Sequence, residues 1–217
     1  MTSTLSRENI DNMEQRYRAN LINSLSGFKP AVLLGTTDGH TNNLAIVSSV
    51  VHIGANPPLL GMIMRPHSVQ RDSLGNIKKS GFYTLNHVHT DWVDKAHQTS
   101  ARYASDESEF DAVGLTPLIT SSFPAPFVEE SNLRIGLKVA QHFTLINNTE
   151  MVIGEIQELH VNEDHIASDG YLDIEASMTA CISGLDSYHS TTRLAQFEYA
   201  KPNLKPRRKR LRTGVPV

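Results

Sequence analysis

The residues with the clearest chemical potential lie in the segment RPHSVQRDSLGNI, at 65–77. It carries two arginines, Arg65 and Arg71, and two serines, Ser68 and Ser73, around the start of an expected helix. Arginine forks, hydroxyl groups and the N–H groups at a helix N-terminus all bind phosphate well. The pattern predicts a phosphate site, although a solvated loop before a capped helix explains the same residues equally well.

A second pattern of interest is the strand TNNLAIVSS at 41–49, which is less apolar than a core strand should be. A strand with small side chains lets a planar ligand approach its backbone closely. A strand whose polar face meets solvent explains the pattern too, and taken alone it is the simpler interpretation. The residues concerned are Asn42, Asn43, Ala45, Ser48 and Ser49.

Histidine and cysteine usage predicts neither a metal site nor a cysteine nucleophile. The ten histidines form no HExxH motif, and no Cys/His set has zinc-ligand spacing. His87 and His89 share one face of an expected strand, a spacing that is more often a surface pair than a metal site. Cys181 has no nearby cation and is expected to be inert. Tyr188 and His189, after the turn GLDS, are the candidates for reaching an active site.

The elements that must position these residues are mostly strands. Motifs of α/β-hydrolases, P-loop proteins and Rossmann folds are absent, and so is regular βαβ alternation. The pattern therefore predicts a mainly β protein, an antiparallel β-barrel with helical insertions. Expected strands lie at 31–54 (two strands around a turn at Asp38-Gly39), 59–66, 82–88, 133–146, 150–161 and 193–200, expected helices at 7–26, 72–80, 91–103 and 108–114, and a surface loop at 118–131.

The charge of the chain is unevenly distributed. The net charge is −3, but residues 201–217 hold seven of the 20 Lys and Arg and no acid. The remainder has 13 basic and 23 acidic residues, a balance of −10. Such a tail could bind nucleic acid or anionic lipid, but a solvated tail, or one folding onto the acidic body or a partner subunit, is the simpler expectation. The apolar runs are too short to span a bilayer, and no signal peptide is evident, so a cytoplasmic location is expected.

Taken in order, several segments resemble the flavin reductase-like family, whose fold is an FMN-binding split β-barrel. The strand at 42–49 is similar to the family's Asn-x-Ala-x-x-Ser strand, and residues 56–66 match its Pro-Pro turn. Residues 71–86 are similar to its Asp-Thr/Ser-x-x-Asn-Ile helix and following strand. The resemblance divides the chain into an N-terminal helical extension at 1–27, a split-barrel domain at 28–202 and a basic tail at 203–217.

The resemblance implies FMN lying along the barrel at a homodimer interface. By matching positions, the isoalloxazine ring would lie along Asn43, Leu44, Ala45 and Ile46, mostly against backbone groups, and Ser48 and Ser49 would bond the ribityl chain or ring edge. The phosphate would be held by Arg65, Ser68, Arg71 and Ser73, the loops oriented by Asn76 and Asn86, and the site closed by Thr99, Ser100 and Ala101.

The activity that the resemblance implies is NAD(P)H-dependent flavin reduction, with hydride passing to flavin N5. The electrons would go on to oxygen, a small acceptor or a partner oxygenase, and the cofactor carries this chemistry. Tyr188 and His189 would shape the nicotinamide side. Two alternatives remain open: a non-catalytic FMN-binding electron carrier, and a nucleic-acid-associated β-barrel that uses the basic tail.

Overall fold

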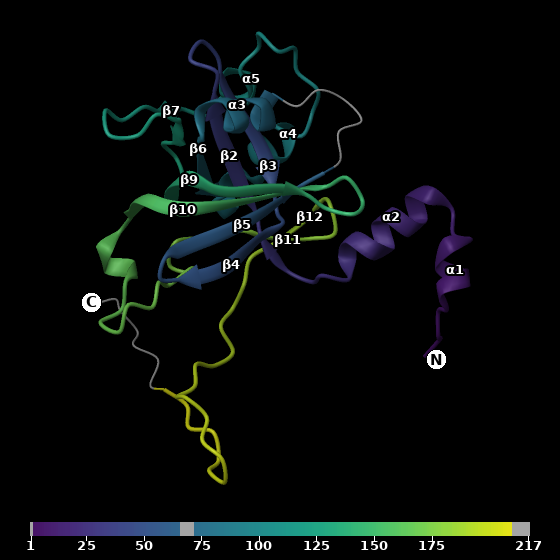
Figure 1. The fold of residues 1–217 in the computed structure, drawn as a ribbon. Helices are drawn as coiled ribbons and strands as arrows, with labels where there is room; N and C mark the ends of the chain where they lie inside the picture. The colour runs from purple at the N-terminus through teal and green to yellow at the C-terminus, as the bar shows by residue number, and fades with distance from the viewer. Residues whose placement is uncertain (1, 66–71, 210–217) are drawn as a thin grey trace.

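The computed structural model describes residues 2–65 and 72–209, and strands dominate it (Figure 1). The largest sheet consists of β2 (Val32–Thr37), β3 (Asn42–Val47), β4 (Val50–Ala55), β5 (Pro58–Met64), β6 (Phe82–His87), β9 (Leu133–Thr144) and β10 (Glu150–Val161). Two small sheets consist of β1 (Lys29–Pro30), β11 (Cys181–Ser183) and β12 (Ser187–His189), and of β7 (Pro117–Leu118) and β8 (Phe127–Val128). The helices are α1 (Arg7–Asp11), α2 (Gln15–Ser24), α3 (Asp72–Ser80), α4 (Val93–Gln98) and α5 (Glu109–Val113), with short 3₁₀ turns η1 (Thr90–Trp92) and η2 (Glu163–His165).

The large sheet runs in the order β3-β2-β6-β9-β10-β5-β4, and every neighbouring pair is antiparallel. The order leaves β3 and β4 as its two edge strands. Helices α3, α4 and α5 gather at the end of the molecule that holds β2 and β3 (Figure 1). The mainly β architecture with helical insertions is therefore confirmed.

Alternate residues of β2 and β3 enter two different cores, because successive side chains of a strand point to opposite faces. Leu34 joins the cluster under α3, which also draws on β5, β6, β9 and β10. Leu33 and Leu44 join a second cluster with Ala96 of α4 and Phe110 of α5. Strand β3 thus lies between α3 on one face and α4 with α5 on the other.

The turn between β2 and β3 forms where the sequence predicts it. Asp38 accepts hydrogen bonds at Oδ1 from the N–H groups of His40 and Thr41, both at 2.7 Å. Gly39 has φ +98°, a conformation that glycine adopts without strain. The segment 31–54 nevertheless forms three strands rather than the expected two, since β4 leaves the β2–β3 hairpin and pairs with β5.

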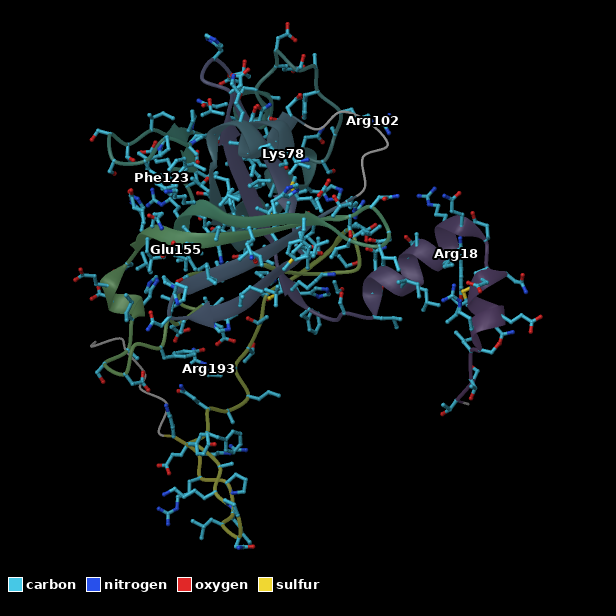
Figure 2. The ribbon with its side chains drawn as sticks, viewed as in Figure 1. Arg18, Lys78, Arg102, Phe123, Glu155 and Arg193 are labelled. Carbon is cyan, nitrogen blue, oxygen red and sulfur yellow. The ribbon has the colours of Figure 1, made fainter. Side chains whose placement is uncertain are left out.

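The N-terminal extension is two helices rather than the single helix that its apolar spacing predicts. Ser6 caps α1 as expected, in a reciprocal capping box with Asn9. A new helix then begins, because the Glu14 side chain accepts a hydrogen bond from the Tyr17 N–H and caps α2. Neither helix buries a residue, and both project away from the sheets, as the position of Arg18 in Figure 2 shows.

The proline-rich segment at 118–131 is a surface loop only in part: residues 119–122 are mostly exposed and irregular, whereas Phe123 and residues 125–128 are buried in the core. It carries β8, and Phe123 and Phe127 are 5% and 0% exposed. Phe123 (Figure 2) packs over Gly136 of β9, where a Cβ atom would lie only 2.9 Å from its ring. The absence of a side chain on β9 therefore makes the space that this aromatic residue fills.

The strand expected at 193–200 is also wrong. This segment belongs to a C-terminal arm that projects from the body, with Arg193 at its base and one isolated bridge between Phe197 and Arg208 (Figures 1 and 2). Leu194 and Tyr199 are 92% and 93% exposed. Within residues 2–65 and 72–209 this segment joins no sheet, and the short strands β11 and β12 form earlier in the chain.

The described part of the basic tail contacts the acidic body. Lys209 Nζ lies 3.0 Å from Asp169 Oδ2, and at the base of the arm Arg193 Nη2 lies 2.6 Å from Asp173 Oδ1. Folding back onto the body was one of the two simpler expectations for this tail. Among the described residues, no helix has the length and apolar character needed to span a membrane.

Candidate functional site

A buried hydrogen-bond network ties β3 to the first half of α3. Asn76 Nδ2 donates to Asn43 Oδ1 at 2.9 Å and to Thr36 Oγ1 at 3.3 Å. The three residues are 7%, 4% and 0% exposed, so each bond replaces water that the polar atoms have lost. Two of the predicted site residues, Asn43 and Asn76, are therefore brought into direct contact.

The residues predicted to hold the phosphate lie in and around residues 66–71, which are outside the described part of the structure. Arg65 is exposed directly after β5, and Ser73 is buried in the first turn of α3. Ser68 and Arg71 lie outside the described residues. The N-terminus of α3 supplies N–H groups and the positive end of a helix dipole next to this segment. The geometry therefore keeps one half of the predicted phosphate site, the helix start, against β3.

A buried carboxylate, Glu150, lies beside the end of β5. It pairs in register with Met64, accepts a hydrogen bond from Thr144 Oγ1 at 3.1 Å, and lies 2.8 Å from His142 Nε2 and 3.8 Å from Lys78 Nζ. Burial raises the pKa of Glu150, but the bond from Thr144 and the charges of Lys78 and His142 outweigh it and lower the pKa overall. A negative charge is thus held, with its counter-charges, next to the strand that ends at Arg65.

The outer edge of β3 is partly covered by α5, which sequence reasoning did not place there. Ser108 Oγ donates to the Asn42 carbonyl at 2.6 Å, and Glu109 Oε2 accepts from the Leu44 N–H at 2.8 Å. The Leu44 N–H is therefore hydrogen-bonded within the protein, while the predicted position of Leu44 beside the ring stays a prediction. The two contacting pairs are 66 and 65 residues apart, so no local pattern could have found them.

Burial raises the pKa of Glu109, and the negative charge of Asp72 raises it further. Hydrogen bonds from the Leu44 N–H and the Asn43 side chain oppose this effect without cancelling it. Glu109 is thus a half-buried acidic group at the edge of β3, where the charge of Asp72 in the first turn of α3 acts on it.

The remaining residues predicted to contact the flavin lie in the second half of β3 and directly after its end at Val47. Ala45, Ile46 and Ser48 are partly buried, whereas Ser49 is exposed. The carbonyl of Ser49 accepts a hydrogen bond from the Ile63 N–H at 2.9 Å, so that group already serves the contact with β5. Ala45 shares its face of β3 with Asn43, toward α3, while Ile46 packs against the core under α4 and α5.

Asn86 and Thr99 use their side chains within the protein. Asn86 is fully buried, and its amide bonds the Leu33 carbonyl, Thr84 Oγ1 and the Val128 N–H at 2.9–3.1 Å. It therefore holds β8 onto the sheet. Thr99 Oγ1 donates to the Ala96 carbonyl at the end of α4. The exposed residues that follow it, Ser100 and Ala101, are the part of this segment that remains open to a ligand.

The two candidate catalytic residues face different surroundings. The Tyr188 hydroxyl lies 3.0 Å from His97 Nδ1, and its ring packs against the core under α4 and α5. Burial, with the nearby Asp186, raises the pKa of Tyr188 to about 12. His189 Nε2 lies 2.8 Å from Ser183 Oγ, and its ring meets the edge of Phe28. Consecutive residues of β12 point to opposite sides, so these two do not converge on one point.

His87 is partly buried rather than half of an exposed pair, and its Nδ1 lies 3.2 Å from Thr179 Oγ1. Burial lowers the pKa of His87 from 6.5 to about 4. Between about pH 6.5 and pH 4, His87 binds a proton in the unfolded chain but not in the native state, so the folded state loses stability as the pH falls through this range. We expect a loss of about 1–2 kcal/mol between pH 7 and pH 5.

The measurement is urea unfolding of the wild type and His87→Gln at both pH values. Because glutamine does not titrate in this range, the variant is expected to lose less stability on acidification. Equal losses in the two proteins would show that His87 does not contribute.

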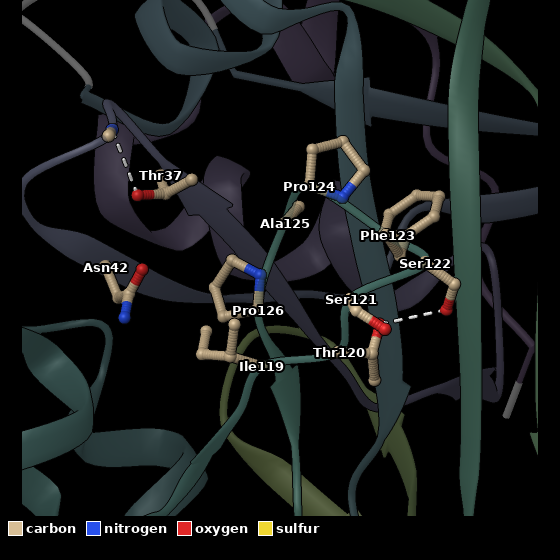
Figure 3. Close-up of a pocket in the computed structure, with 11 residues that line it drawn as sticks. Thr37, Asn42, Ile119, Thr120, Ser121, Ser122, Phe123, Pro124, Ala125 and Pro126 are labelled. Atoms are coloured by element: carbon tan, nitrogen blue, oxygen red, sulfur yellow. Dashed lines mark hydrogen bonds between the residues drawn. The ribbon is translucent and has the colours of Figure 1, made fainter.

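A separate open hollow of about 540 Å³ lies between the β2–β3 turn and the 119–126 segment (Figure 3). Asn42 and Thr37 line one side, and Thr120 and Ser122 line the other. The Ser122 hydroxyl donates to Thr120 Oγ1 at 3.3 Å. Its lining side chains include hydroxyls, an amide and apolar groups but no ionisable group. The described lining therefore offers hydroxyl and amide groups for hydrogen bonding, and the Ser122 hydroxyl also donates to Glu158 Oε2 at 3.0 Å.

Comparison with known proteins agrees with this geometry. A family profile described as Flavin reductase like domain matches residues 25–178. The fold is similar to that of a candidate flavin reductase with a split barrel domain from Shewanella frigidimarina, with a TM-score of 0.87 and 51% identity over 92% of this chain and 100% of that one. Component B of nitrilotriacetate monooxygenase from Bacillus cereus has a similar fold, with a TM-score of 0.79 and 21% identity over 92% and 100% of the two chains. The uncharacterized protein YwrF of Bacillus subtilis is 25% identical over 76% of this chain and 78% of its own.

The mainly β fold with a split barrel therefore defines the class of protein. Since the family profile covers most of the chain, the protein belongs to the flavin reductase-like family of FMN-binding split barrels. The predicted family resemblance is confirmed. The residues that contact the flavin are still a prediction.

Proposed function

We propose that this protein is an FMN-dependent oxidoreductase that takes hydride from NAD(P)H and passes the electrons to oxygen, a small acceptor or a partner oxygenase. The observation that carries the proposal is the buried Asn43–Asn76 contact, which fixes the start of α3 against the edge strand β3. A helix start suits a phosphate, and a strand edge offers hydrogen bonds to a planar ring. Family membership supports the same cofactor.

The residues present fit FMN in their chemistry. The N–H groups at the start of α3 and the Ser73 hydroxyl would hold the phosphate, with Arg65 contributing charge from the end of β5. Asn43 and Ala45, on the face of β3 toward α3, would lie against the ring, with Ile46 at the strand edge. When bound, FMN supplies the hydride acceptor and the route for electrons.

The chain's own part in this chemistry is orientation and exclusion of water. The hydrogen bonds of Asn76 fix the position of α3 relative to β3. The core under α4 and α5 supports β3 from the opposite face. The reaction requires no side-chain nucleophile. It is therefore compatible with the Tyr188 and His189 side chains pointing to opposite sides of β12. Tyr188, through its contact with His97, would shape the nicotinamide side.

We also propose that the active form is a cytoplasmic homodimer with FMN at the subunit interface. Exposed apolar side chains support this assembly: Leu25 on the N-terminal extension is 70% exposed, and Leu194 on the C-terminal arm is 92% exposed. Projecting elements that bury little apolar surface within one subunit bury more of it when they pack against a second subunit. Light scattering of the purified protein should give twice the chain mass, and the monomer mass would contradict this assembly.

The proposed activity is tested by mixing the protein, FMN and NADH or NADPH without oxygen. We expect the visible flavin absorbance to disappear much faster than with FMN and the nicotinamide alone. Tight FMN binding without faster reduction would instead favour the electron-carrier alternative. Steeply salt-dependent binding to DNA or RNA, lost on removal of residues 201–217, would favour the nucleic-acid alternative.

A further inference from the structure

The outer edge of β3 has a fixed pattern of backbone groups. Strand β3 pairs with β2 on one side only. In an antiparallel strand the N–H and C=O groups of every second residue point to the same side. Because the Leu44 N–H meets Glu109 rather than β2, the backbone groups of Asn42, Leu44 and Ile46 all point to the outer edge.

Two of these outward groups are taken by the start of α5. Ser108 binds the Asn42 carbonyl, and Glu109 binds the Leu44 N–H. The helix is held in place from below, since Phe110 is fully buried in the core that also contains Leu44. Helix α5 thus occupies the position of a neighbouring strand along the first half of β3.

No described residue bonds the backbone groups along the second half of this edge. Within the described ranges, the outward N–H of Ile46 and the outward carbonyls of Leu44 and Ile46 have no hydrogen-bond partner. The open groups are therefore one donor between two acceptors. A planar heterocycle with adjacent carbonyl and N–H groups, as in the pyrimidine half of a flavin, would pair with this edge when shifted by one group: a ring carbonyl would accept from the Ile46 N–H, and the ring N–H beside it would donate to a neighbouring strand carbonyl.

We propose that Glu109 is a positioning residue of the flavin site: its bond to the Leu44 N–H fixes the strand edge and leaves the groups of Leu44 and Ile46 to the cofactor ring. This inference rests on the proposed function. The Asn43 side chain also hydrogen-bonds Glu109, and the charge of Asp72 in the first turn of α3 acts on it. A carboxylate is a strong acceptor for a backbone N–H. Glu109 is therefore suited to keep its bond to the Leu44 N–H when a ligand binds at the strand edge.

The test compares Glu109→Ala, which removes the acceptor, with Glu109→Gln, which keeps an acceptor of the same length without charge. FMN affinity is measured by quenching of flavin fluorescence. We expect affinity to fall about tenfold in the alanine variant and to recover to within about threefold of the wild type in the glutamine variant. Amide hydrogen exchange in 42–47 should speed up in the alanine variant and remain slow in the glutamine variant.

Glu130→Ala is the matched control. Glu130 is a carboxylate that accepts hydrogen bonds from the N–H and hydroxyl of Thr116, at 2.9–3.1 Å. Its loss should cost stability in the same way, but FMN affinity and exchange in β3 should stay unchanged. If Glu109→Ala does not fold, Glu109→Asp draws the carboxylate away from Leu44 while keeping its charge, and is expected to weaken FMN binding in the same direction.

The failures of the two proposals are distinguishable. A wild type that binds FMN, together with a folded Glu109→Ala or Glu109→Asp that binds it equally well, overturns the positioning role alone. Equal weakening by Glu130→Ala also overturns it, because the effect would then follow general stability. A wild type that binds no FMN overturns the proposed function and with it this inference.

Discussion

Asn76→Ala is expected to lower the FMN affinity of the folded protein by about tenfold or more. The substitution removes the donor shared by Asn43 and Thr36, and both acceptors stay buried. A buried polar atom left without a partner costs about 1–3 kcal/mol, so the free energy of unfolding should also fall by about 2 kcal/mol. Helix α3 then loses its fixed position against β3, and with it the alignment of a phosphate site and a ring site.

The measurement is an FMN titration alongside urea unfolding, with Ser131→Ala as the control. Ser131 is 1% exposed, and its hydroxyl bonds the His87 and Leu133 carbonyls, which belong to β6 and β9 rather than α3. Its loss should destabilise the protein by a similar amount and leave the affinity of the folded fraction near the wild-type value. If the two variants bind FMN equally well, the Asn43–Asn76 contact has only a structural role.

Gly35→Ala is expected to reduce the free energy of unfolding by about 3 kcal/mol or more. Gly35 lies in β2 between Leu44 of β3 and Thr84 of β6. A Cβ atom there would overlap the backbone carbonyl oxygen of Pro126 and the Thr84 hydroxyl, which are themselves hydrogen-bonded to each other at 2.6 Å. A backbone oxygen cannot move aside as a flexible side chain can, so β8 must shift.

Gly75→Ala is the matched control, because a Cβ atom at this exposed position of α3 meets nothing within 4 Å. Alanine inside a helix is preferred over glycine by about 0.5–1 kcal/mol, so this variant should be slightly more stable than the wild type. Both are measured by urea unfolding. A Gly35→Ala protein as stable as Gly75→Ala would contradict the close packing of β8 on β2.

Local chemistry made much of the fold predictable. The Asp38-Gly39 turn, the Ser6 cap and the short helix that ends before Gly81 each depend on residues within one turn of one another. The long strands β9 and β10 show clear β-type runs. The expected strand at 193–200 failed for the opposite reason, because its alternation describes a side-chain pattern and says nothing of whether a partner strand exists.

The sequence predicted which residues belong to the candidate site better than it predicted which residues they contact. The family resemblance pointed to Asn43 and Asn76, and the structure brings them together. The role of Glu109 depends on a contact 65 residues away along the chain, which only the packing of α5 creates. Phe123 was misjudged in the same way, since the space it fills is made by Gly136 on a distant strand.

The central claim is that this chain binds FMN, and the most direct measurement is the visible absorbance spectrum of the purified protein, with any chromophore identified after denaturation. The account predicts a flavin spectrum and release of FMN, or, for protein purified without cofactor, stoichiometric quenching of added FMN. A colourless protein that leaves the fluorescence of added FMN unchanged would contradict it.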